Sequence, residues 1–259
     1  MCLFVGEFAY GSLGWSIADA DYVWWYCSTE NSSLAFVSFS MDYMKLSKKT
    51  LNILKNFATI NQTFHIKKGS KISVMFDDCV FAKAEVEETF PNPVLIYDMN
   101  KLLGTLSLFS SPNVEFEDKQ LIIAEGPHTV TYRYGDPFIV REVPEVKAVP
   151  DKVSLECELS DQVLVMAQKA AALFSIKTFS IVGTDGKATL MLGDTKTDTY
   201  QHELGDCTDE FDYKFTLDNL KIMPETYTMV LGSKKGSGMM SMKAKNVEYV
   251  FAANKDSVV

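Results

Sequence analysis

The same order of expected elements occurs twice along this chain, and this repetition restricts the possible folds more than any other feature of the sequence. Ser47 is a typical helix N-cap residue, and apolar residues at helical spacing follow it as far as Ala58. Strand-like runs come next, then the segment Tyr97–Leu102, in which a strand leads into a short helix, and then further strands. Ser160 begins the second copy, and Leu217–Lys221 occupies the matching place. An internal duplication with a period of about 105 residues accounts for this order.

Two stretches of different composition divide the chain. Residues 137–152 contain three prolines and mixed charges, which indicates an extended connector because proline cannot donate to a strand ladder. Residues 1–43 hold all three tryptophans and five acidic residues but no lysine or arginine. We therefore expect a first domain at 44–136, a connector at 137–152 and a second domain at 153–259. Each domain should pack two helices on a largely antiparallel sheet, which is an α+β fold.

Residues 1–43 allow two interpretations. They form an extra interaction segment rich in aromatic residues, or they precede a natural start at Met44. We favour the second interpretation because the capped helix begins directly after Met44, where a compact domain would start.

The motifs argue against several classes of function. The five cysteines are far apart and form no CxxC pair, so neither a disulfide framework nor a zinc site is expected. Phosphate-loop, zinc-protease and nucleophile-elbow motifs do not occur, and GSKKGSG at 232–238 has the wrong spacing and lies between expected strands. We expect no cofactor, no metal ion and no enzymatic activity. The sequence has no run of about 18 apolar residues, so no membrane span is predicted.

Several segments are specific enough to indicate a family. They are MKLSKKTLNILKNFATIN (44–61), LIYDMNKLLGTLSLF (95–109), LDNLKIMPETYTMVL (217–231) and the closing YVFAA (249–253). From Met44 onward the chain resembles the DNA polymerase sliding clamps, or processivity factors, of T-even-type tailed bacteriophages. The resemblance implies two similar domains per protomer and a homotrimer that closes a ring around duplex DNA. It also implies a replicative DNA polymerase and an ATP-dependent clamp loader as partners, in the cytoplasm of an infected bacterium.

Such a ring would attract phosphates without reading bases, and long lysines on the helices suit this task. A single lysine is usually only a surface residue, but lysines occur on all four expected helices. The expected DNA-facing residues are Lys45, Lys48, Lys49, Lys55, Lys101, Lys169 and Lys221. Acids facing outward on the strands, such as Glu85, Glu87 and Glu88, would then reconcile a net negative charge with DNA binding.

Sliding clamps bind short partner peptides near the connector, so the resemblance also implies a peptide pocket. We expect Val143 and Val146 of the connector to form it with Val250 and Ala252 of the last strand. Residues 128–134 (HTVTYRY) are a candidate edge strand for closing the ring.

Two alternatives remain at this point. A β-rich oligomeric structural or assembly protein of a virion would need no basic helices and would not encircle DNA. A hydrolase on a β-rich fold is less favoured, because no nucleophile, base and orienting residue occur as a set.

Overall fold

The computed structural model describes residues 14–17, 23–26, 43–146, 149–193 and 198–258. The chain divides into two compact units, Met1–Met44 and Lys45–Val259. In the first unit, β1 (Gly14–Ile17) pairs antiparallel with β2 (Val23–Tyr26), and β3 (Tyr43–Met44) ends the unit. Residues 1–13, 18–22 and 27–42, on which both interpretations of the N-terminal stretch depend, lie outside the described residues.

The second unit contains two series of elements in the same order: a helix, four strands, a helix or helical turn, and three strands. The first series is α1 (Lys48–Ile60), β4 (Phe64–Ile66), β5 (Gly69–Phe76), β6 (Val80–Phe90), β7 (Val94–Ile96), α2 (Met99–Leu106), β8 (Asn113–Phe116), β9 (Gln120–Glu125) and β10 (His128–Arg133). After β11 (Lys152–Leu159), the second is α3 (Asp161–Phe174), β12 (Thr178–Thr184), β13 (Lys187–Leu192), β14 (Tyr200–Asp206), β15 (Phe211–Thr216), η1 (Leu217–Asn219), β16 (Tyr227–Lys234), β17 (Ser237–Lys243) and β18 (Val247–Ala252). The predicted α+β architecture is confirmed.

The predicted helix starts follow from local hydrogen bonds. The Ser47 hydroxyl accepts from the Thr50 N–H at 3.2 Å, and the Ser160 hydroxyl accepts from the Val163 N–H at 3.4 Å. Each satisfies one backbone donor that the first helical turn leaves unpaired. Both predicted caps are therefore confirmed.

The fourth expected helix is reduced to one 3₁₀ turn, η1. Thr216 precedes it without a side-chain cap bond, and Leu220 leaves helical geometry at φ −79° and ψ 59°. Pro224 follows closely, lacks an N–H and disfavours helical geometry in the residue before it, so an α-helix cannot continue there. Lys221 consequently lies just beyond the turn.

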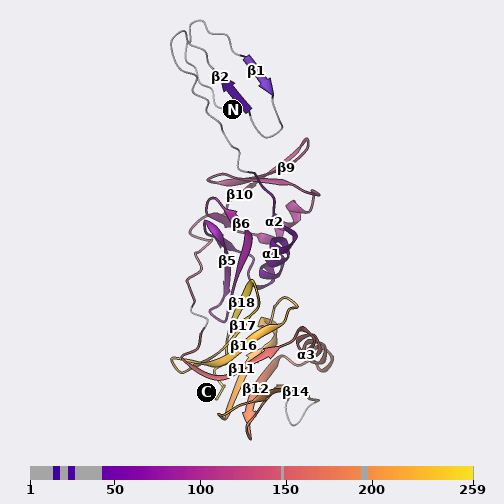
Figure 1. The fold of residues 1–259 in the computed structure, drawn as a ribbon, viewed down its shortest axis with the longest axis vertical. Helices are drawn as coiled ribbons and strands as arrows, with labels where there is room; N and C mark the ends of the chain where they lie inside the picture. Colours follow the sequence, from indigo (N-terminus) through magenta and orange to yellow (C-terminus); the bar gives the residue numbers. More distant parts are fainter. Residues whose placement is uncertain (1–13, 18–22, 27–42, 147–148, 194–197, 259) are drawn as a thin grey trace. The chain divides into compact units, whose positions relative to one another are not determined.

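One sheet joins the two series of elements. Among the described strands its order is β11–β16–β17–β18–β6–β5, and the junction is the antiparallel pairing of β18 with β6, from Val247 opposite Ala84 to Phe251 opposite Val80. Figure 1 shows this sheet running from β5 and β6, beside α1, through β18, β17 and β16 to β11. Separate antiparallel ladders connect β8–β9–β10, β4–β7 and β14–β13–β12–β15.

The two faces of β5 and β6 differ because side chains alternate along a strand. Ile72, Val74, Ala82 and Ala84 are buried in the main core, which α1 covers. The intervening residues, including Lys71 and Lys83, therefore lie on the opposite face. This core also contains buried residues of both series, so the two halves share one apolar interior.

A two-residue turn at Asp185–Gly186, a dipeptide typical of hairpins, joins β12 to β13. Asp185 and Gly186 have φ values of 53° and 79°, as a two-residue primed turn requires. Of the helices in the described ranges, none has the length and apolar character needed to cross a membrane.

Candidate nucleic-acid interface and partner groove

The exposed face of α1 carries lysines at helical spacing. Lys48 and Lys55 are exposed on this face together with Asn52, and Lys45 is exposed just before the helix. Lys49 is also exposed, but its ammonium lies 2.9 Å from Glu87 Oε1. The hydrogen bond from Lys49 to Glu87 raises the pKa of Lys49. Of the three lysines within α1, Lys48 and Lys55 are therefore better placed than Lys49 to contact an external anion.

Glu88 does not face outward into solvent as expected. Glu85 and Glu87 are exposed, whereas Glu88 is partly buried and accepts hydrogen bonds from the Ser47 N–H and the Thr50 hydroxyl. Burial raises the pKa of Glu88, but these hydrogen bonds outweigh burial and hold that pKa below its usual value. The expectation for Glu88 was wrong because its carboxylate anchors the start of α1 to β6.

The other helices present fewer charges. Lys101 is exposed on α2, where the Asp98 side chain accepts from its backbone N–H at 3.0 Å. Lys169 is exposed on α3, but Met166 and Leu173 on that helix are also 55% and 78% exposed. The exposed surface of α3 thus combines apolar and polar side chains.

Lys221 is bound to the end of α1. Its ammonium donates to the Thr59 carbonyl at 2.8 Å, while its own carbonyl accepts from Asn56 Nδ2 at 3.2 Å. The Tyr249 hydroxyl donates to Asn56 Oδ1 at 2.6 Å and accepts from the Met223 N–H at 3.3 Å. Burial raises the pKa of Tyr249. This network fixes α1 to the second half of the unit.

A second apolar cluster lies on the sheet face opposite α1. Phe81, Met239 and Val250 are buried in it, and Met75, Val143 and Val146 pack against them. Three of the four residues expected for a peptide pocket are thus brought together. Ala252 is exposed and lies opposite Met239 in the β17–β18 register, outside the cluster.

Phe81 and Met239 were missed from the sequence, although a signal exists for Phe81. It is out of phase with Ala82 and Ala84 along β6, so it must face away from the α1 core. The position of Met239 beside it depends on the order of three strands, which no local pattern reveals.

A groove of about 750 Å³ continues from this cluster along the connector. Its walls include Phe81, Val143 and Val146 together with six lysines, Lys67, Lys68, Lys71, Lys83, Lys243 and Lys245. The ammonium of Lys83 lies 2.7 Å from Glu248 Oε2, and Lys67 forms an ion pair with Glu142. We call this surface the lysine groove.

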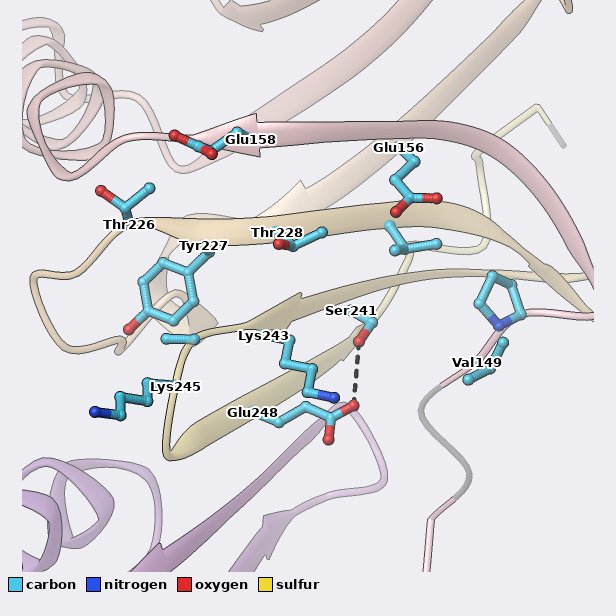
Figure 2. A pocket seen from close by; sticks show the side chains of 13 residues that line it. Val149, Glu156, Glu158, Thr226, Tyr227, Thr228, Ser241, Lys243, Lys245 and Glu248 are labelled. Carbon is cyan, nitrogen blue, oxygen red and sulfur yellow. Dashed lines mark hydrogen bonds between the residues drawn. The ribbon is translucent and has the colours of Figure 1, made fainter.

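A neighbouring groove of about 600 Å³ on the same sheet has mixed charge. Figure 2 shows Glu156 and Glu158 on β11 along one side and Lys243 and Glu248 on the other. The dashed line marks the 3.5 Å hydrogen bond from the Ser241 hydroxyl to Glu248. Because its lining contains both acids and lysines, this groove offers no surface of one charge. Within the described ranges, no group of three or more metal-binding side chains is placed to hold a metal ion.

Comparison with known proteins gives three similar phage proteins, each called a sliding clamp. The protein of Enterobacteria phage T4 is 30% identical over 226 residues, which cover 83% of this chain and 98% of that protein. The protein of Vibrio phage KVP40 is 27% identical over 220 residues, or 81% and 98% of the two chains. The protein of Escherichia phage RB69 is 26% identical, with 83% and 98% covered. No protein-family model matches the chain.

Solved structures of low sequence identity share the fold. One is A. fulgidus PCNA, solved with the C-terminal region of FEN-1 bound, which superposes with a TM-score of 0.63 at 13% sequence identity. The match covers 82% of this chain and 99% of the PCNA chain. The Helicobacter pylori beta clamp, solved with a DNA ligase peptide bound, gives 0.60 at 13% identity, with 94% and 76% covered.

Proposed function

The chain belongs to the sliding-clamp family, and on this premise we propose that three copies close a ring around duplex DNA and tether the replicative polymerase to it. The observation that carries the proposal is the 30% identity with the T4 protein over 98% of that protein's length. A ring of this kind works by topology: it converts the fast dissociation of a polymerase into sliding. It catalyses no reaction and is opened by an ATP-dependent loader. It would act in the cytoplasm of the infected bacterium.

The domains of the ring would be residues 44–136 and 153–259, joined by the connector at 137–152. The repeated order of elements supports this division, as does the absence of helices and strands from the described connector residues before Lys152. A chain that begins at Met44 should therefore fold and assemble like the full chain. Loss of assembly in that shortened chain would show that residues 1–43 are structural.

The DNA-facing surface would be formed by the exposed lysines of the helices. Lys48 and Lys55 of α1, Lys101 of α2 and Lys169 of α3 are exposed and make no ion pair within 4.0 Å with a described carboxylate. Such lysines attract phosphates without fixing a base sequence. Lys45 lies beside this set. Lys49 and Lys221 would contribute less, because each ammonium already has an intramolecular acceptor.

The ring would close through edge strands. Strand β10 ends the ladder β8–β9–β10, and β14 ends the ladder β14–β13–β12–β15. The other end of the latter ladder, β15, is partly covered because Asp212 forms a bridge with Val258. We therefore propose that β10 of one protomer pairs with β14 of the next, which would satisfy the backbone groups of both edges.

Partner proteins would bind at the second apolar cluster. Val143, Val146 and Val250 would form the peptide pocket with Phe81, and exposed Ala252 would lie at its rim. The relatives and the solved structures do not support the alternative of a virion structural or assembly protein.

Charge reversal on the helices tests the DNA-facing surface. The variant Lys48→Glu/Lys55→Glu/Lys169→Glu should lose clamp-dependent polymerase processivity, measured as product length on a primed circular template with the cognate loader. Its native mass should not change, because none of the three residues lies on β10 or β14.

The matched control is Lys119→Glu/Lys235→Glu/Lys255→Glu, which makes the same charge change at exposed positions outside the helices. This control should keep its processivity. Unchanged product length in the helix variant would refute the DNA-facing assignment, and equal losses in both variants would attribute the effect to net charge alone.

A further inference from the structure

The two series of elements differ in charge at matching positions of α1 and α3. Ser47 caps α1 and Ser160 caps α3, so the two helices can be aligned on these residues. Each exposed lysine on α1 or just before it is matched by an acidic residue or a glutamine. The matched pairs, all exposed, are Lys45 and Glu158, Lys48 and Asp161, Lys49 and Gln162, and Lys55 and Gln168. The two halves therefore share the capped helix but not its positive charge.

The exposed face of α1 suits a polyanion. Lys48, Asn52, Lys55 and Thr59 follow each other at helical spacing, and all four are exposed. Three lysines and no acidic residue give the helix a side-chain charge of +3. Lys48 and Lys55 have no carboxylate oxygen within 4.0 Å among the residues that the structure describes. Both ammonium groups are thus available to phosphates.

Helix α3 offers no equivalent face. The four positions that match this stripe hold Asp161, Val165, Gln168 and Ala172, all exposed. None of them is positive, and one is negative. With Lys169 as its one lysine and Asp161 as its one acid, the helix has a side-chain charge of zero. A surface of this kind has no net attraction for a phosphate backbone.

The helical elements that follow differ in the same direction. Lys101 of α2 is exposed and has no carboxylate oxygen within 4.0 Å among the described residues. Its counterpart after η1 is Lys221, whose ammonium already donates to the Thr59 carbonyl at 2.8 Å. Asp218 within η1 is exposed. Because α2 packs against α1, the unpaired lysines of these two helices lie together in the first half.

We propose that the first half of each protomer holds the duplex, through the lysines of α1 and α2, and that α3 contributes little. This inference rests on the proposed ring, and it adds which helices carry the attraction for DNA. Three protomers would present three basic surfaces that alternate with three surfaces of no net charge. At 0.1 M salt the attraction between a lysine and a phosphate is largely screened beyond about 10 Å. The duplex would therefore lie against α1 most of the time instead of being centred between six equal surfaces.

Photocrosslinking from matched positions tests this proposal. One protein carries Asn52→p-benzoylphenylalanine on α1 and the other carries Val165→p-benzoylphenylalanine on α3. Both positions are exposed and lie equally far from their helix caps. Each full chain is loaded onto nicked circular duplex by the cognate loader, and the yield of protein–DNA adduct per loaded ring is measured. We expect roughly fivefold more adduct from α1, because the unpaired surface charges lie beside that position.

Moving charge between the helices gives a second readout. The variant Gln162→Lys/Gln168→Lys places lysines on α3 where α1 has Lys49 and Lys55, and it should raise the adduct yield from position 165 roughly threefold. Lys48→Gln/Lys55→Gln should lower the yield from position 52 roughly fivefold. The control Lys119→Gln/Lys255→Gln also removes two exposed charges, but outside the helices, and should leave both yields unchanged.

Equal adduct yields from the two positions would overturn the inference, and so would yields that do not follow the charge changes. Absence of adduct from both positions on loaded rings would overturn it as well. Native mass and retention on circular DNA are measured on the same preparations. If these two fail in the unmodified protein, the ring itself is refuted. If they hold while the adduct test fails, only the unequal contribution of the helices is refuted.

Discussion

The contact between Glu88 and the start of α1 leads to a quantitative prediction. The Glu88 carboxylate accepts from the Ser47 N–H and from the hydroxyl of fully buried Thr50. The variant Glu88→Gln keeps the size of the side chain but removes its charge. It also places an amide NH₂ group opposite one of the two donors, the Ser47 N–H or the Thr50 hydroxyl. A hydrogen bond to a charged group contributes about 1.5–3 kcal/mol against about 1 kcal/mol for a neutral one, and an anion at a helix N-terminus adds about 0.3–1 kcal/mol. We expect the free energy of unfolding to fall by about 2 kcal/mol at neutral pH.

The measurement is urea unfolding of the two proteins followed by circular dichroism, with Glu87→Gln as the matched control. Glu87 is on the same strand, but its side chain is 60% exposed and pairs with a lysine that is 72% exposed. An exposed pair of this kind contributes little, so the control should lose less than about 0.5 kcal/mol. Equal losses in the two variants would refute the reasoning.

The pH dependence of this loss has a definite sign. The folded-state pKa of Glu88 lies below the ordinary value of 4.5 for a glutamate, so the contribution of its charge to stability is fully present above that value. The contribution disappears as the pH falls through the lowered folded-state pKa, because the carboxylate is then protonated in both states. The stability gap between Glu88→Gln and the unmodified protein should therefore be constant from neutral pH to about pH 6 and should close at acid pH. A gap that is unchanged in acid would contradict the role of the charge.

Three further substitutions test the packing. Tyr249→Phe removes the buried hydroxyl that joins α1 to the second half and should cost about 2 kcal/mol in urea unfolding, whereas Tyr97→Phe, at a side chain 59% exposed, should cost almost nothing. In Gly232→Ala the new methyl group would lie 2.1 Å from a carbonyl oxygen of the paired strand β11, so we expect a loss of more than about 2 kcal/mol or a failure to fold. Gly104→Ala meets open space within helix α2 and should raise stability by up to about 1 kcal/mol. The reverse order of stability for the two glycine variants would contradict the described contacts.

The features that could be predicted from the sequence are mostly local. The caps at Ser47 and Ser160 and the turn at Asp185–Gly186 depend on residues within a few positions of each other, so short patterns are sufficient to locate them. The repeated order of elements was visible for the same reason, because each helix and strand has its own periodicity. Only the helix expected at Leu217–Lys221 was shortened, since the missing cap and Pro224 outweigh its apolar spacing.

The features that could not be predicted depend on strand order. The lysine groove joins residues near position 70 to residues near position 245, and they meet only because β18 pairs with β6. The capping role of Glu88 and the pairing of Lys49 with Glu87 require the position of β6 against α1. Alternation along β6 predicts which side chains share a face, but not which element lies over that face.

The central claim, that three copies of this chain close a ring, is tested most directly by the native mass in solution. Light scattering coupled to size exclusion, over a range of protein concentrations, should give about three times the chain mass of 29.0 kDa, with dissociation on dilution. A species that stays monomeric at high concentration would leave no closed ring and would contradict the account.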